Sequence, residues 1–261
     1  MAHGGADGGR LMKIVRAPKM ERWVLDATKT WLQARPRAKG VHVSDLLNPR
    51  KGFWKVVDPQ PMTDAEAGYF VAGLGHHAVI EGIIEKADHA EVSTSKLSTD
   101  AGTYEWRGIH YSPDVLTPHP LEVKTSRSRY GPKSQSERSL LVEYEHYLKQ
   151  LRAYCAIRGD GRGDLLVFYL NLEDKVTKKS TPTFQWYTIT LTPQEIGKIQ
   201  ADLLAGKAAL EKAIKAKKHR PLLLCPEWLC RGCQWIEQCK PWEDDPRRAK
   251  FQPKTILREQ P

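Results

Sequence analysis

The sequence lacks any apolar run long enough to cross a membrane. Hydrophobic residues make up 40% of its 261 positions, yet no run approaches the roughly 18 residues that a spanning helix needs. The first ten residues are rich in glycine and contain no apolar segment, so no signal peptide is visible. We find no internal repeat. We therefore expect a soluble, intracellular chain that does not act at a membrane.

Cysteine is scarce, and four of the five cysteines fall within residues 225–239. In a reducing compartment, such clustering indicates a metal or iron–sulfur site rather than disulfides. The fifth, Cys155, stands apart, and we expect it to pack as a small apolar side chain.

Acidic residues are outnumbered: 41 Lys and Arg oppose 31 Asp and Glu, giving a net charge of +10 and a pI near 9.3. A basic surface attracts polyanions, of which nucleic acid is the commonest in a cell. Ordinary solubility charge explains the same excess equally well. The charge becomes informative only where it agrees with a site.

The hydrophobic periodicity predicts strands that alternate with long helices. Thr63 with Glu66, and Thr192-Pro193 with Glu195, have the pattern of helix starts. The expected helices are 20–33, 62–87, 136–158 and 192–218. The expected strands are 103–107, 109–111, 114–116, 121–125, 164–170 and 184–191. This alternation predicts an α/β domain with a mixed sheet.

One polar group stands out among these strands. In Leu121-Glu-Val-Lys124 the apolar residues alternate with Glu122 and Lys124, which places the two charged side chains on one face of a strand. Asp114 ends the preceding apolar segment. Two carboxylates can share a hard divalent cation, and a nearby ammonium can polarise water or stabilise charge on a phosphate. We interpret the group as a site for metal-dependent phosphodiester cleavage, although Glu-x-Lys alone is a common exposed pattern.

The string Pro113-Asp114-x7-Glu122-x-Lys124 matches the signature of the PD-(D/E)XK nucleases. Two further motifs resemble the RecB-like branch of that superfamily. His77 lies between Gly73 and Glu81 in the helix before the strands, and Gln150-x3-Tyr154 follows in the helix after them. The resemblance implies a restriction-endonuclease-like core, with a mixed central sheet flanked by helices.

The cysteines extend this resemblance. They are spaced Cys225-x4-Cys230-x2-Cys233-x5-Cys239, and the last three resemble those of the AddB-type and CRISPR-associated iron–sulfur exonucleases. Those relatives take their fourth ligand from an upstream Cys-Pro-Arg, where this chain has Asn48-Pro49-Arg50. Cys225 offers a replacement. The module is expected to bind a [4Fe–4S] cluster, with Zn²⁺ as the alternative.

The resemblance also assigns roles to the site residues. Asp114, Glu122, the Val123 carbonyl and His77 would bind one or two Mg²⁺ or Mn²⁺ ions, with the imidazole favouring Mn²⁺. Lys124 would orient or help deprotonate the attacking water. Gln150 and Tyr154 would hold the scissile strand.

We thus expect a flexible basic arm at 1–20, a nuclease domain at 21–220, a four-cysteine module at 221–242 packed on the core, and a tail at 243–261. The expected function is a DNA exonuclease, acting on single strands or ends in DNA processing, recombination or CRISPR adaptation. Its setting would be the cytoplasm of a bacterium or a phage-infected host. Partners could be a separate helicase, annealing protein or CRISPR integrase. Two alternatives stay open: a DNA-binding adaptor that does not cut, and a structure- or site-specific endonuclease.

Overall fold

A computed structural model describes residues 18–33, 38–86, 103–115, 118–132, 136–174 and 176–252 of the chain. The elements, in order, are α1 (Pro18–Gln33), β1 (Val41–His42), α2 (Val43–Leu47), α3 (Pro49–Val57), α4 (Asp64–Lys86), β2 (Tyr104–Trp106), β3 (Ile109–Tyr111), β4 (Leu121–Ser126), α5 (Glu137–Glu143), α6 (Glu145–Arg158), β5 (Arg162–Glu173), β6 (Ser180–Thr190), α7 (Pro193–Ala216), α8 (Glu227–Cys230), α9 (Ile236–Cys239), α10 (Pro241–Asp244) and the 3₁₀ helix η1 (Pro246–Phe251).

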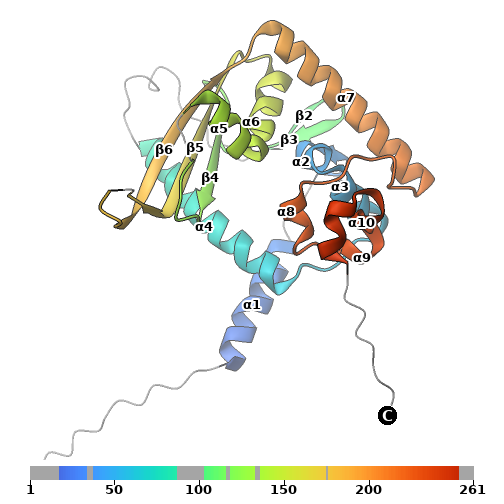
Figure 1. Ribbon diagram of the computed structural model, residues 1–261, viewed down its shortest axis with the longest axis horizontal. Helices are drawn as coiled ribbons and strands as arrows, with labels where there is room; N and C mark the ends of the chain where they lie inside the picture. The colour runs from blue at the N-terminus through green and yellow to red at the C-terminus, as the bar shows by residue number, and fades with distance from the viewer. Residues whose placement is uncertain are drawn as a thin grey trace, which may run out of the picture.

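The larger sheet has the strand order β4-β5-β6 and is mixed, as expected (Figure 1). β4 runs parallel to β5, and β6 runs antiparallel to it. One face packs against α6 through Leu148, Leu151, Leu165 and Val167. The other face packs against α4, where Ile80 meets the apolar side of β4. Helices therefore flank both faces, which confirms the expected mixed α/β architecture.

A second, smaller sheet has the order β1-β3-β2. β1 pairs with β3 in parallel, and β2 pairs with β3 antiparallel. Within the described residues the strands thus divide between two three-stranded sheets, whereas the sequence suggested one central sheet. Tyr154 of α6 and Leu203 of α7 pack with Ile109 of β3 in one apolar cluster, so these helices lie against the small sheet as well.

The short strand expected at 114–116 is reduced to an isolated bridge. Val115 and Leu121 exchange backbone hydrogen bonds of 3.2 and 3.0 Å in antiparallel sense. The chain therefore folds back immediately before β4, as a hairpin would, and this brings Asp114 beside that strand.

The single helix expected at 136–158 is wrong: it breaks at Tyr144 into α5 and α6. Tyr144 has φ −102° and ψ 14°, outside the helical region. Its ring is buried against the sheet, where the hydroxyl contacts that of Tyr169 and donates to Gln185 Oε1 at 3.3 Å. These partners lie on distant strands, so helix periodicity alone could not reveal the break.

The two helix starts read from the sequence are confirmed. Thr63 Oγ1 accepts from the Glu66 amide at 3.2 Å, and Glu66 Oε2 accepts from the Thr63 amide at 3.1 Å. Thr192 and Glu195 form the same reciprocal pair at the start of α7. In each pair the Thr hydroxyl and the Glu carboxylate accept from backbone amides that the first turn of a helix leaves unpaired.

The C-terminal segment from α8 to η1 folds as a compact unit beside α3 (Figure 1). Trp235 is buried, and its indole N–H donates to the Asp58 carbonyl at the end of α3 at 2.8 Å. Residues 243–251, assigned above to a tail, form the end of α10 and η1. The expected arm at 1–20 lies outside the described residues up to position 17. None of the described helices has the length and apolarity to cross a membrane.

The contact between α6 and β5 yields a stability test. A Cβ added at Gly163 would collide with Cys155 Sγ and lie 3.0 Å from Leu151 Cδ1. Cys155 is fully buried, as predicted. Gly163→Ala should therefore lower the free energy of unfolding by about 1–3 kcal/mol, measured by urea denaturation. Gly197→Ala in α7, where the Cβ meets nothing within 4 Å, should instead be neutral or stabilising. Equal effects of the two substitutions would contradict this packing.

Candidate active site

One hydrogen bond joins Asp114 to β4. The Val123 amide donates to Asp114 Oδ2 at 2.7 Å. Among the described strands β4 lies at the edge of its sheet, and beyond the bridge from Leu121 to Val115 its outer backbone groups can bond a side chain. The bond places the Asp114 carboxylate against the middle of the Glu122-Val123-Lys124 run, as the sequence motif requires.

Glu122 and Lys124 lie on the face of β4 that α6 covers. The Glu122 side chain is 1% exposed and the Lys124 side chain 21%, and Lys124 Nζ donates to Glu122 Oε1. Burial alone would lower the pKa of Lys124, but the charges of Glu122 and Asp114 outweigh it and raise that pKa above its ordinary value. Lys124 is therefore a protonated cation that is paired with Glu122 and feels the charge of Asp114.

Gln150 and Tyr154 share one face of α6 and bond to each other. Gln150 Nε2 donates to the Tyr154 hydroxyl at 2.8 Å. Tyr154 is 4% exposed; burial, and then the charge of Glu122, raise the pKa of its hydroxyl well above the usual value. Tyr154 thus lies behind the carboxylates, and the half-buried Gln150 lies nearer the surface. His77 is in α4, but its side chain lies outside the described residues.

Two aromatic residues that the motifs did not single out, Tyr147 and His146, lie beside Lys124. Lys124 Nζ lies 6.0 Å from the centre of the Tyr147 ring, and the His146 ring centre is 3.9 Å from that of Tyr147. Burial lowers the pKa of His146, and the positive charge of Lys124 lowers it further. A signal was available, because His146, Gln150 and Tyr154 recur every four residues along α6.

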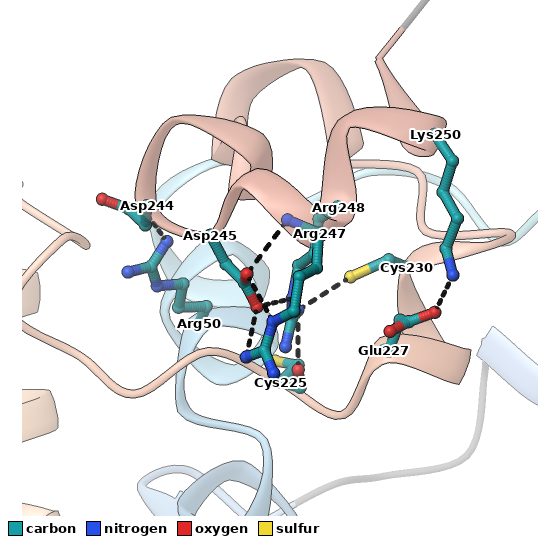
Figure 2. A network of polar contacts seen from close by, with 9 residues as sticks. All are labelled: Arg50, Cys225, Glu227, Cys230, Asp244, Asp245, Arg247, Arg248 and Lys250. Atoms are coloured by element: carbon teal, nitrogen blue, oxygen red, sulfur yellow. Dashed lines mark hydrogen bonds and ion pairs between the residues drawn. The ribbon is translucent and has the colours of Figure 1, made fainter.

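The four clustered cysteines line one cavity of ≈ 20 Å³ together with Arg50 and Arg248. Arg248 donates to the Cys225 carbonyl at 2.9 Å and to Cys230 Sγ at 3.3 Å (Figure 2). Arg50 donates to the Leu222 carbonyl at 3.0 Å and to Asp244 Oδ2 at 2.6 Å. The Asn48-Pro49-Arg50 string therefore lies against the cysteine segment.

Cys225, Cys233 and Cys239 each face groups that offset part of the pKa rise caused by burial. Burial raises the pKa of the Cys225 thiol, while the Lys51 and Arg50 amides at the start of α3 oppose that rise. Burial likewise raises the pKa of Cys239, opposed by the Arg50 guanidinium. It also raises the pKa of Cys233, which the Trp235 amide and the charge of Lys51 oppose.

Four thiols surrounded by N–H donors and cations are a suitable donor set for a thiophilic metal or an iron–sulfur cluster. Nonetheless, across the part of the chain that the structure describes, no three His, Cys, Asp or Glu side chains lie close enough together to hold a metal ion. At β4 the described side chains supply two carboxylates, those of Asp114 and Glu122, and so they also form no group of three. The donor chemistry of both places fits a metal, and their present geometry is not a closed coordination shell.

No family model and no curated protein matches the chain. Among solved structures, a protein described as SSO0001 covers 85% of this chain and 97% of its own, at 15% identity and a TM-score of 0.51. An alkaline exonuclease from Laribacter hongkongensis covers 77% of this chain and 97% of its own, at 16% identity and a TM-score of 0.36. A phage-related exonuclease from Haemophilus somnus 129PT covers 70% and 98%, at 13% identity and 0.38. The first of these likenesses shows a shared fold.

The bond between Val123 and Asp114 can be tested separately from catalysis. Asp114→Ala leaves the Val123 amide without this acceptor, and should lower the free energy of unfolding by about 1–3 kcal/mol. Asp114→Asn keeps an oxygen at the same place and should cost less than half as much. Denaturant unfolding of both variants against wild type checks the difference. Equal losses would mean that the bond does not hold Asp114 in place.

Proposed function

We propose that the chain is a metal-dependent deoxyribonuclease of the RecB-like branch of the PD-(D/E)XK superfamily, acting as an exonuclease on DNA. The observation that carries the proposal is the meeting of Asp114, Glu122 and Lys124 at β4. The turn of the chain before β4 brings them together, through the bond from Val123 to Asp114 and the ion pair of Lys124 with Glu122. The net charge of +10 agrees with a polyanionic substrate.

Asp114, Glu122 and the Val123 carbonyl would hold Mg²⁺ or Mn²⁺, with His77 as an added ligand. Oxygen ligands suit these hard cations. A bound divalent metal supplies an activated water at neutral pH and neutralises charge on the phosphate. The burial of Glu122 supports this role, because a carboxylate kept from water gains from any cation that replaces its hydration.

Lys124 would act beside the scissile phosphate. Its ammonium stabilises negative charge that develops during hydrolysis, and it can orient the attacking water by donating a hydrogen bond. Lys124 must lose its own proton before it can accept one from water. The charges of Glu122 and Asp114 oppose that loss, because they raise the pKa of Lys124. Gln150 would contact the scissile strand, whereas the burial of Tyr154 favours a role in positioning Gln150 and the carboxylates.

The cysteine segment would hold a [4Fe–4S] cluster or Zn²⁺ through Cys225, Cys230, Cys233 and Cys239. Its main role would be structural, because the free energy of metal binding is also free energy of folding. It would join the C-terminal segment to α3, where Arg50 of α3 already donates to Asp244 and Trp235 donates to the Asp58 carbonyl. This module, the partners and the cellular process are proposals that follow from the sequence resemblance.

Cleavage of end-labelled linear DNA with Mn²⁺ tests the nuclease site. Lys124→Ala and Asp114→Asn should each slow cleavage by roughly 100-fold or more, because both remove charge that acts on the transition state. Glu105→Gln, an exposed acid on β2, is the matched control and should cleave normally.

Three outcomes would change the proposal. Equal cleavage by all variants would exclude Asp114 and Lys124 from the site. Binding of DNA without cleavage by wild type would favour the adaptor. Cleavage of a closed circle as fast as linear DNA would favour an endonuclease.

Metal analysis and thermal melting test the cysteine segment. Purified protein should contain iron with a brown colour, or zinc without colour. Cys230→Ser and Cys233→Ser should lose that metal and lower the melting temperature. Gln238→Ser, an exposed substitution in the same segment, should change neither. Melting of the cysteine variants at the wild-type temperature would refute a structural metal.

A further inference from the structure

An aromatic pair connects the cysteine segment to the helix over the candidate active site. Trp228 of α8 lies with its ring centre 5.3 Å from that of His146 at the start of α6, and the two ring planes are inclined by 58°. Trp228 is 57% exposed although it lies two residues before the buried Cys230. A single exposed aromatic residue is ordinary, so the significance lies in what surrounds it.

His146 lies between Trp228 and the catalytic lysine. Its ring is 3.9 Å from that of Tyr147, which in turn is 6.0 Å from Lys124 Nζ. No step in this chain of groups exceeds 6.0 Å. Trp228 is therefore linked to Lys124 through the rings of His146 and Tyr147, although the two lie 104 positions apart in the sequence.

The helix that carries Trp228 is held at both ends. Glu227 forms an ion pair with Lys250 of η1, and Arg248 donates to Cys230 Sγ and to the Cys225 carbonyl (Figure 2). Arg248 is itself 8% exposed. A large aromatic ring kept exposed on a fixed helix loses little conformational freedom when it binds a flat partner.

We propose that Trp228, with His146, stacks against an unpaired nucleobase of the DNA strand that enters the active site, so that the cysteine segment binds substrate directly. The identity of this ligand rests on the proposed function. A nucleobase is the flat partner that DNA offers, and stacking on aromatic rings does not depend on base identity. Bases within a duplex are stacked on one another, so the site selects single strands and frayed ends.

The test measures binding of a fluorescently labelled oligothymidine and of a blunt duplex, without added divalent metal. Trp228→Ala should weaken binding of the single strand roughly 10-fold and leave duplex binding nearly unchanged. Trp228→Phe should restore most of the affinity. Trp23→Ala, which removes an exposed tryptophan from α1, is the matched control and should bind as wild type does.

Two further readouts separate substrate contact from a structural role. In cleavage of single-stranded DNA, Trp228→Ala should raise KM and leave kcat within about twofold. Ultraviolet cross-linking of a 5-iodouracil oligonucleotide to wild type should label the peptide containing Trp228 or that containing His146.

Unchanged single-strand affinity in Trp228→Ala, or cross-links confined to other peptides, would overturn the inference even if the protein cleaves DNA. Trp228→Ala should melt at the wild-type temperature. If Trp228→Ala instead unfolds, the single-strand affinity of Trp228→Phe decides whether the ring binds the base. A protein that binds through Trp228 but never cleaves would leave the stacking site standing and refute the nuclease proposal.

Discussion

The candidate site depends on the burial of one carboxylate, that of Glu122, between β4 and α6. Glu122 is 1% exposed, and a carboxylate in that position costs several kcal/mol unless it is paired. Lys124, two residues along the same strand, supplies the opposite charge on the same face. The Val123 amide between them points to Asp114. The strand thus pairs one carboxylate with Lys124 and bonds the other through the Val123 amide.

The same constraint organises the C-terminal segment. Arg50 is 3% exposed and Arg248 is 8% exposed, and both donate to backbone carbonyls and acidic side chains of that segment. A buried guanidinium has five donors in a fixed plane, so it fixes the position of several chain segments at once. Arg50 thereby connects α3 to residues more than 170 positions later. Burial raises the pKa of the Cys239 thiol, and the Arg50 guanidinium beside it offsets part of that rise.

Local patterns in the sequence were sufficient for much of the fold. The helix starts at Thr63 and Thr192 depend on residues three apart, and the strand β4 depends on a two-residue period, so both could be predicted. In the structure the Val123 amide donates to Asp114 and Lys124 pairs with Glu122, and the catalytic roles that the motif assigns to these residues stay predictions. The break at Tyr144 and the division into two sheets could not be predicted, because they depend on contacts with distant strands. Trp228 was missed because its proximity to α6 exists only in three dimensions, whereas the four-residue spacing of His146, Gln150 and Tyr154 could have pointed to His146.

That proximity bears on why a nuclease would carry the cysteine segment. A segment that only stabilised the fold could end at its contacts with α3, where Arg50 and Trp235 bury their polar groups. Instead α8 extends to α6 and places Trp228 beside His146. Arg248 holds α8 by donating to Cys230 Sγ and to the Cys225 carbonyl, so a change that breaks these bonds would also loosen the contact of Trp228 with His146. Under the proposed function, stability of the segment and binding of substrate would then be lost together.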